Sequence, residues 1–442
     1  MKWNQFVVLT TCCLMSVQTL SAFQVQQSPV LGKPELNEPK NLNVESFNFI
    51  WKTIKDTHWD ADLVGESWDK HKEELLPKVE AAEDIHEARA VMSELIGRLE
   101  QSHFGVIPSD SYDVMDGEAG GSSDIGIKGR LIDGELVVTQ VRKGSTAESA
   151  GVKPGWAIEQ IGKRSSEELI ERFKKAEEGP QRAETIAGLG LRRLTSGSAG
   201  QEISIRFSTT DGQEKDLKIG CATPPGKMAR LGNLPPMLVS DETRTLEDNI
   251  GYYQFSAFLD PIRIMPNYRK AVRNAEHTGG LVIDLRGNVG GLAAMTMGMA
   301  GEFVTERKSL GTMDMKGNSL KFVANPRANP IKVPVAVLVD ECSISSAEIF
   351  AGGLQDLGLA KVFGKRTAGL ALPSMVVKLP NGDGFQYAMA DYHSANGESL
   401  EVNGVTPDEN VKLTKENLSQ ENDPVLNAAI EWIKKQNQQQ EK

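Results

Sequence analysis

LVIDLRGNVGG, at residues 281–291, joins an apolar run to a turn rich in glycine. The apolar run is typical of a buried strand, and a glycine-rich turn before a helix lets backbone N–H groups point at an anion. We therefore interpret Gly290 and Gly291 as candidates for an oxyanion hole. Glycine pairs more often only satisfy backbone geometry, so this interpretation depends on the surrounding sequence.

A second junction lies at residues 337–351, which read VLVDECSISSAEIFA. A strand there ends in small polar residues before a helix begins, which suits an exposed nucleophilic serine, although a lone serine at a helix start is usually only a cap. Around both junctions we expect strands at 251–255, 280–285 and 333–339 and helices at 295–303 and 346–357. This α/β pattern predicts a core over residues 246–423.

Two further units precede the core, as the 442-residue length also suggests. Apolar residues recur at helical spacing between residues 42 and 99, so we expect a helical domain over residues 42–112. That pattern stops at SHFGV, which places His103 on a junction rather than inside a helix. In residues 123–220, Asp-Gly pairs separate strand-like runs and predict β-hairpins, and residues 221–245 are expected to form a linker.

The two ends of the chain carry different signals. Lys2, an apolar run over residues 6–15 and Leu20-Ser21-Ala22 predict a secretory signal peptide over residues 1–22, with export to the periplasm or beyond. Lipidation at Cys12 is a minor alternative, and residues 23–41 are expected to be a flexible lead-in. An amphipathic helix is expected from residue 424, and the Gln-rich end after residue 435 is expected to be disordered.

Composition excludes several kinds of partner. The formal net charge of −11, from 49 basic and 60 acidic residues, argues against nucleic acid. The apolar run near the N-terminus is too short to span a membrane stably. The mature chain keeps only Cys221 and Cys342, so its stability must come from packed cores rather than disulfides.

Four motifs together resemble the tail-specific and tricorn-type serine peptidase family. They are DLRGNVGG at 284–291, SISSAEI at 343–349, the segment from Gly364 to Gly369 and EVNGVTPD at 401–408. The resemblance spans most of the mature chain and implies a crotonase-like α/β core that hydrolyses polypeptides. It implies that Ser345 is the nucleophile, and that Gly291, Gly290 and the Ser345 N–H group hold the oxyanion.

The two branches of this family differ in the residue that acts as base. In the processing-protease branch a lysine follows the glycine-bounded segment, whereas this chain has Leu370 there. The tricorn-type branch uses a histidine preceded by a serine, which matches Ser102 and His103. The resemblance thus implies that His103 takes the proton of the nucleophile, that Ser102 orients His103 and that Glu401 supports Ser102.

This mechanism needs no metal and no organic cofactor, and the mature chain lacks the usual zinc, P-loop and G-x-S-x-G motifs. Ser346, beside the expected nucleophile, is uncharged. We expect Ser346 to contact the substrate and, because it has no charge, to give no preference for basic substrate side chains.

Residues 123–220 also resemble the PDZ domains of exported proteases, notably at GVKPGWAI, residues 151–158. Such a domain adds an extended peptide to a sheet edge and holds its terminal carboxylate with backbone N–H groups. Gly126-Ile127-Lys128-Gly129 is the candidate carboxylate loop, and polypeptide C-termini are the expected ligands. The same module can instead only brace or gate its neighbour.

Two other functions remain open. The interphotoreceptor retinoid-binding proteins resemble these peptidases yet carry apolar ligands, so a non-catalytic binding protein is one alternative. A scaffold that captures C-termini, with an inactive core, is the other. The presence of both Ser345 and His103 favours catalysis.

Overall fold

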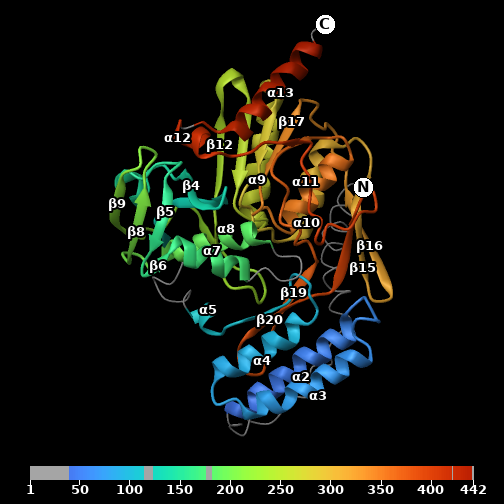
Figure 1. Cartoon of the computed structure of the whole chain (residues 1–442). Helices are drawn as coiled ribbons and strands as arrows, with labels where there is room; N and C mark the ends of the chain where they lie inside the picture. The colour runs from blue at the N-terminus through green and yellow to red at the C-terminus, as the bar shows by residue number, and fades with distance from the viewer. Residues whose placement is uncertain (1–38, 114–122, 176–181, 421, 441–442) are drawn as a thin grey trace.

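The computed structural model describes residues 39–113, 123–175, 182–420 and 422–440. The predicted signal peptide, Cys12 and most of the expected lead-in lie outside these residues. Figure 1 shows a group of helices from the N-terminal region, a β-rich module beside it and an α/β core that extends to the C-terminus.

The core is built on a six-stranded sheet with the order β12-β13-β14-β17-β18-β22. These strands span Asp241–Thr245, Gly251–Phe255, Leu281–Asp284, Val335–Val339, Lys361–Gly364 and Glu409–Asn410. Only β12 runs antiparallel to its neighbour. Because β14 and β17 are parallel neighbours, the turns that follow them leave the sheet at the same edge.

Helices cover both faces of this sheet, as the alternation of side chains along each strand requires. Ile283, Val337 and Val339 face a core shared with α9 (Pro261–Asn274), α10 (Ala293–Ala300) and α11 (Ser346–Asp356). Val282 and Leu338 face α13 (Pro424–Gln440) on the other side. The α/β pattern expected from the sequence is therefore present.

The C-terminal helix is longer than predicted. The Gln-rich end continues as helix α13 to Gln440, so the prediction of disorder after residue 435 is wrong. Glutamine is a good helix former, and the Asn437 side chain donates to the Gly279 carbonyl at 2.7 Å, which ties this part of the helix to the core.

The β-rich module holds a sheet with the order β3-β4-β5-β8-β9. Its strands are Ile127–Ile132, Glu135–Val141, Ala157–Ile161, Glu202–Ser208 and Glu214–Gly220, with the short strands β2 (Ser123–Asp124), β6 (Arg164–Ser165) and β7 (Ser196–Gly197) beside them. Helices α6 (Thr146–Ser149), α7 (Ser166–Lys175) and α8 (Ala183–Leu194) complete it. Both predicted hairpins are present, and β3 is an edge strand.

The N-terminal helices α2 (Pro39–Thr57), α3 (Glu66–Ala81) and α4 (Ile85–Gly97) pack with residues from far along the chain. Leu379 and Phe385 belong to their apolar core. Strand β1 (Gly105–Ile107) also pairs with β20 (Gly384–Ala388), which pairs with β19 (Ser374–Lys378). The helices, which we call the helical layer, are thus anchored to a hairpin of the core region.

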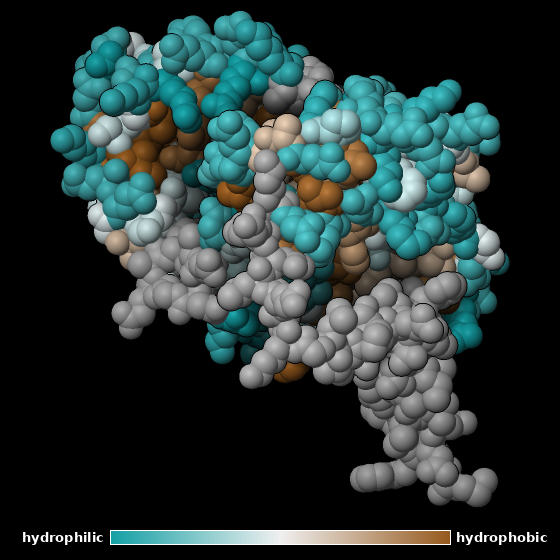
Figure 2. Space-filling view, turned by 90° about the horizontal axis from the view of Figure 1, so that it is seen from below, coloured by the Kyte–Doolittle hydropathy of each residue, from teal (hydrophilic) through white to brown (hydrophobic). Residues whose placement is uncertain are grey.

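The remaining elements are short or lie at the periphery. They are α5 (Asp110–Asp113), β10 (Lys227–Ala229), β11 (Met237–Val239), η1 (Glu247–Asn249), η2 (Ala275–His277), η3 (Gly301–Phe303), β15 (Lys308–Met315), β16 (Asn318–Ala324), β21 (Ala390–Ser394) and α12 (Lys415–Ser419). On the face seen in Figure 2 the surface is mainly hydrophilic, with hydrophobic residues visible in recesses. Among the described residues, no helix combines the length and the apolar character needed to cross a membrane.

One buried ion pair joins the helical layer to the hairpin of β19 and β20, and we predict that its loss lowers the free energy of unfolding. Asp383 has a fully buried side chain and accepts from Arg89 Nη2 at 2.6 Å and from the Ser109 N–H at 2.8 Å. Arg89→Ala leaves a buried carboxylate without its counter-ion, so we expect a loss of about 3–5 kcal/mol in urea unfolding. Lys52→Ala, which breaks an exposed pair with Asp56, is the control and should cost less than about 1 kcal/mol. Equal effects of the two variants would contradict this prediction.

Candidate active site

Ser345 stands out among the three serines at the start of α11. Ser343 donates to the Leu285 carbonyl at 2.8 Å, and Ser346 donates to the Gly291 carbonyl at 2.9 Å, so both hydroxyl groups are engaged. Within the described part of the chain, the Ser345 hydroxyl donates to no acceptor, and its residue is partly exposed. Its φ of 57° is positive, a strain that non-glycine residues often carry at functional sites.

The buried carboxylate of Glu348 holds the backbone of Ser345 in this conformation. Glu348 Oε2 accepts from the Ser345 N–H at 2.9 Å and from the Leu370 N–H at 3.1 Å. Glu348 Oε1 accepts from the Thr367 hydroxyl at 2.6 Å and from the Gly369 N–H at 2.7 Å. Burial raises the pKa of Glu348 to about 7, although these hydrogen bonds work against the rise. The carboxylate therefore binds Ser345 to residues 367–371, which we call the strap.

A second carboxylate, Glu401, binds the other side of the strap. Glu401 Oε2 accepts from the Ala371 N–H at 3.0 Å and from the Ser102 hydroxyl at 2.9 Å. Glu401 Oε1 accepts from the Ser102 N–H at 2.9 Å. Ser102 Oγ in turn lies 2.7 Å from His103 Nδ1. The predicted trio of His103, Ser102 and Glu401 is therefore brought together.

This chain of hydrogen bonds defines which nitrogen of His103 carries a proton. The Ser102 hydroxyl has one hydrogen, and it is donated to the Glu401 carboxylate. Ser102 Oγ can then only accept from His103, so Nδ1 carries hydrogen and Nε2 is left with its lone pair. Burial lowers the pKa of His103 to about 4, which keeps the ring neutral. The geometry thus prepares Nε2 as a base.

Ser345 and His103 are connected indirectly, by hydrogen bonds that run through the strap. Besides its bond to Glu348, the Ser345 N–H donates to the Leu370 carbonyl at 2.9 Å. Among the described residues, no hydrogen bond joins the Ser345 hydroxyl to the His103 ring. Catalytic hydrogen bonds are often loose without substrate, so this separation does not remove His103 as a candidate.

The glycine turn lies directly against Ser345. A Cβ atom on Gly290 would lie 2.7 Å from Ser345 Cβ, and one on Gly291 would lie 2.4 Å from the Phe258 carbonyl oxygen. The Gly290 N–H donates to Asn288 Oδ1 at 2.9 Å. In the described residues, the Gly291 N–H and the Ser346 N–H have no such acceptor. These two groups are free to bind an oxyanion, whereas the expected Ser345 N–H donor is already used by Leu370 and Glu348.

The position where the other branch carries lysine is apolar here. Leu370 is buried in a small cluster with Ile344 and Ala368, and Leu189 of helix α8 packs against it. Helix α8 belongs to the β-rich module. The module therefore touches the strap beside the candidate nucleophile.

Polar contacts also join the module to the turns of the core. Arg130 of β3 binds Asp340 at 2.6 Å, with both side chains nearly buried. Asp340 Oδ1 accepts from the Gly287 N–H at 2.8 Å and from the Cys342 N–H at 3.0 Å. The Thr185 hydroxyl of α8 donates to the Glu341 carbonyl at 2.9 Å. Asp340 thus links the module to both turns that form the site.

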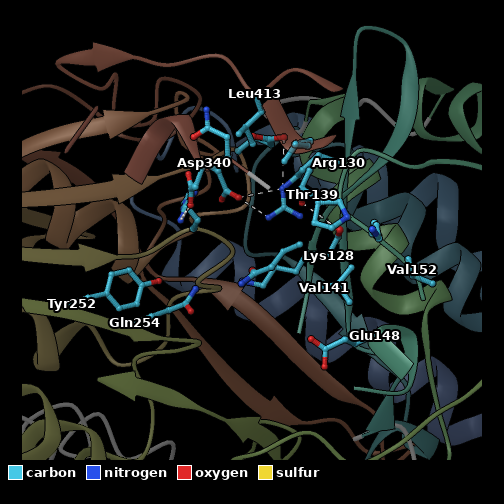
Figure 3. Close-up of a pocket in the computed structure, with 18 of the residues that line it drawn as sticks. Lys128, Arg130, Thr139, Val141, Glu148, Val152, Tyr252, Gln254, Asp340 and Leu413 are labelled. Carbon is cyan, nitrogen blue, oxygen red and sulfur yellow. Dashed lines mark hydrogen bonds and ion pairs between the residues drawn. The ribbon is translucent and has the colours of Figure 1, made fainter. Parts of the chain in front are cut away.

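A polar cavity of about 450 Å³ lies between the module and the core. Figure 3 shows Lys128, Arg130 and Thr139 of the module on one side, facing Tyr252, Gln254 and Asp340 of the core. Burial lowers the pKa of Lys128, and the nearby Asp284 carboxylate opposes that shift. The cavity is separate from the Ser102, His103 and Ser345 constellation, because none of these three residues lines it.

Two predicted substrate contacts differ from the structure. Of the four residues expected to form a carboxylate loop, only Gly126 lies outside a strand, since Ile127, Lys128 and Gly129 pair with β4. Ser346 is 1% exposed and its hydroxyl donates to the Gly291 carbonyl, so it stabilises the turn rather than facing a substrate.

Sequence reasoning also missed two residues that shape the site. Glu348 lies three positions after Ser345, which is the spacing of a capping box. This spacing could have indicated that its side chain bonds the Ser345 N–H. Asp340 had no local signal, because its partner Arg130 is 210 residues away in the chain.

Comparison with known protein families finds two matches. Residues 249–411 match the model described as peptidase family S41, and residues 40–97 match the Tricorn protease C1 domain. The first match contains Ser345, Glu348, the strap and Glu401. The second covers the helical layer.

Curated relatives are similar over much of the chain. The carboxy-terminal processing protease CtpA of Bacillus subtilis (strain 168) is 24% identical over 283 residues, which cover 64% of this chain and 54% of that protein. A carboxyl-terminal-processing protease of Synechocystis sp. (strain ATCC 27184 / PCC 6803 / Kazusa) is 23% identical over 372 residues, covering 82% and 79%. The match thus spans about half of the Bacillus protein and most of the Synechocystis protein.

Solved structures share the fold. The photosystem II D1 C-terminal processing protease has a TM-score of 0.55 at 20% identity, covering 87% of this chain and 97% of that one. Mature CPAF has a TM-score of 0.59 at 12% identity, covering 91% and 97%. At these identities the likeness concerns the fold alone.

The state of His103 gives a direct test of the site geometry. Because burial lowers the pKa of His103 to about 4, its ring should stay neutral from pH 8 down to pH 5, while an ordinary histidine becomes protonated near pH 6.5. The hydrogen-bond chain further predicts that Nδ1 carries the hydrogen. Ring-nitrogen NMR shifts of histidine-labelled protein measure both properties, and His103→Ala assigns the signal. A midpoint near 6.5, or a hydrogen on Nε2, would contradict the described arrangement.

Proposed function

We propose that this chain, whose residues 249–411 match peptidase family S41, is an exported serine endopeptidase that cleaves polypeptides through an acyl-enzyme on Ser345. One observation carries this proposal. The continuous hydrogen-bonded chain from Glu401 through Ser102 to His103 supports Nε2 as the base. The strap connects that chain to Ser345, whose hydroxyl donates to no acceptor among the described residues.

In the first step the Ser345 oxygen attacks the peptide carbonyl carbon while His103 Nε2 takes the hydroxyl proton. The carbonyl oxygen becomes negative, and the N–H groups of Gly291 and Ser346 donate to it. The C–N bond then breaks as His103 returns the proton to the leaving amine. Water hydrolyses the ester in a second round, with His103 again as base and then as acid.

Ser102 and Glu401 act on His103 and not on the substrate. When Nε2 takes a proton, the ring becomes an imidazolium cation, and Nδ1–H continues to donate to Ser102. The negative charge of the Glu401 carboxylate stabilises that cation, and the Ser102 hydroxyl, which donates to Glu401, links the two groups. Leu370 stands at the position where the other branch carries its lysine base, so His103 takes the role of base in this proposal.

We further propose that the core is of the crotonase type and that the β-rich module is a PDZ-type domain which binds substrate C-termini at strand β3. The Val138 N–H donates to the Trp156 carbonyl, and the Val138 carbonyl accepts from the Gly155 N–H. Both bonds lie on the side of β4 away from β3. Gly129, the partner of Val138, must therefore direct its own N–H and carbonyl to the edge of β3 that pairs with no strand among the described residues, which we call the free edge. A peptide added at that edge would reach Gly129, whose carbonyl accepts from Arg130 Nη1 at 2.8 Å.

The same contacts support a gating role for the module. Arg130 touches both the free edge of β3, at Gly129, and the Asp340 carboxylate that joins the two turns of the site. Binding of a peptide at the edge would compete for the Arg130 side chain. We propose that the module in this way couples substrate capture to the geometry of the turns.

The central test is proteolysis by the mature chain. We expect wild type to cleave casein and to react with a fluorophosphonate probe, and Ser345→Ala and His103→Ala to lower the cleavage rate by about 10⁴-fold. His277→Ala, at an exposed histidine, is the matched control and should behave as wild type. Full activity in Ser345→Ala or His103→Ala would remove the site assignment. Peptide or apolar-ligand binding by an inactive wild type would instead favour a binding protein.

Recognition of C-termini is tested with the substrate rather than the enzyme. If backbone N–H groups of the module hold a terminal carboxylate, amidation of the substrate C-terminus should lower kcat/KM by about tenfold, since a charged hydrogen-bond acceptor is lost. Acetylation of the substrate N-terminus is the control and should leave the rate unchanged. Equal cleavage of the free and amidated peptides would exclude carboxylate capture while leaving the peptidase proposal intact.

A further inference from the structure

His58 is a fully buried histidine of the helical layer, just after the end of α2, that lies against the turn carrying Ser102 and His103. Its Nε2 lies 2.8 Å from Gln101 Oε1, and its Nδ1 lies 3.0 Å from the Asp60 nitrogen. Nδ1 also lies 3.2 Å from the Asp60 carbonyl oxygen, so the Gln101 contact decides the tautomer: Nε2–H donates to Gln101 Oε1, and Nδ1 accepts from the Asp60 N–H. The opposite tautomer would place two acceptors against each other at the Gln101 contact.

The His58 ring also makes stacking contacts. It stacks on Trp59 with centroids 4.2 Å apart and on Phe104 with centroids 6.0 Å apart, the latter at an interplanar angle of 19°. Gln101 and Phe104 are the residues immediately before and after the Ser102-His103 pair. A single side chain of the helical layer therefore contacts both sides of that pair.

The turn needs such support because its backbone is strained. Glu100 and His103 both have positive φ angles, 52° and 61°, and neither is glycine. Each residue of this kind costs about 1 kcal/mol in local conformational energy. Without outside contacts the turn would relax toward ordinary φ values and carry the His103 ring with it.

We propose that His58 is a positioning residue for His103, holding the Ser102-His103 turn through its hydrogen bond to Gln101 and its stacking on Phe104. This inference rests on the proposed peptidase function, in which His103 is the base. A base must lie about 2.6–3.2 Å from the proton it takes. A shift of about 1 Å in a catalytic group can lower a rate by about 100-fold. Loss of the His58 contacts should therefore act on catalysis and leave substrate binding alone.

The two contacts can be separated by substitution. His58→Phe keeps a stacking ring and removes the donor, whereas His58→Gln keeps an N–H donor near the position of Nε2 and removes the ring. We expect His58→Phe to lower kcat and the rate of fluorophosphonate labelling by about tenfold or more, with KM within about twofold of wild type. His58→Gln should restore part of this loss. His86→Phe, at an exposed histidine of the same layer, is the matched control and should leave both rates unchanged.

Gln101→Leu removes the same hydrogen bond from the other side and serves where His58→Phe does not fold. If the two residues act through one bond, the double variant His58→Phe/Gln101→Leu should be no slower than the slower single variant. Additive losses, a change in KM alone, or wild-type labelling of both single variants would overturn the inference. An active wild type with unaffected His58 variants would sink this inference alone, whereas a wild type that neither cleaves nor reacts with the probe would remove the proposed function as well.

Discussion

Two carboxylates, the buried Glu348 and the half-buried Glu401, organise the candidate site through a single five-residue strap. Glu348 joins the strap to the backbone of Ser345, and Glu401 joins it to Ser102. Burying a carboxylate is unfavourable unless donors surround it, and each of these receives at least three hydrogen bonds. The raised pKa of Glu348 and of Glu401 shows that desolvation still outweighs those bonds. This unfavourable burial occurs where the two candidate catalytic residues, Ser345 and His103, are connected to each other.

The same arrangement explains why the site depends on parts that are distant in the sequence. Ser345 follows a central strand of the core, where parallel pairing with β14 brings the glycine turn alongside. His103 comes from the end of the helical layer, 242 positions earlier, and the pairing of β1 with β20 anchors the segment that follows it to the core region. The docked module adds Leu189 and Arg130 to the surroundings. Each unit alone would carry only part of the constellation.

The sequence allowed the α/β core, the two hairpins of the module and the clustering of Ser102, His103 and Glu401 to be predicted. Short-range signals sufficed for the strands and turns, and the motif resemblance supplied the trio. Hydrogen-bond partners could not be predicted in the same way, because a motif does not say which N–H groups are already occupied. The Ser345 N–H was expected to face the oxyanion, yet it is bound by Leu370 and Glu348. Ser346 was expected to face a substrate, yet it is buried against Gly291.

Leu370 gives a physical reason for the proposed use of a histidine from another unit. Its side chain lies in an apolar cluster closed by Leu189 of the module. A lysine at this position would place an ammonium group among apolar side chains, where burial opposes the charged form. With an apolar residue there, the proposed base lies outside the strap, and hydrogen bonds through Ala371 and Glu401 connect the strap to the Ser102-His103 turn. In the proposed mechanism the position of the base depends on that strained turn, so the packing of the helical layer would be part of the catalytic geometry.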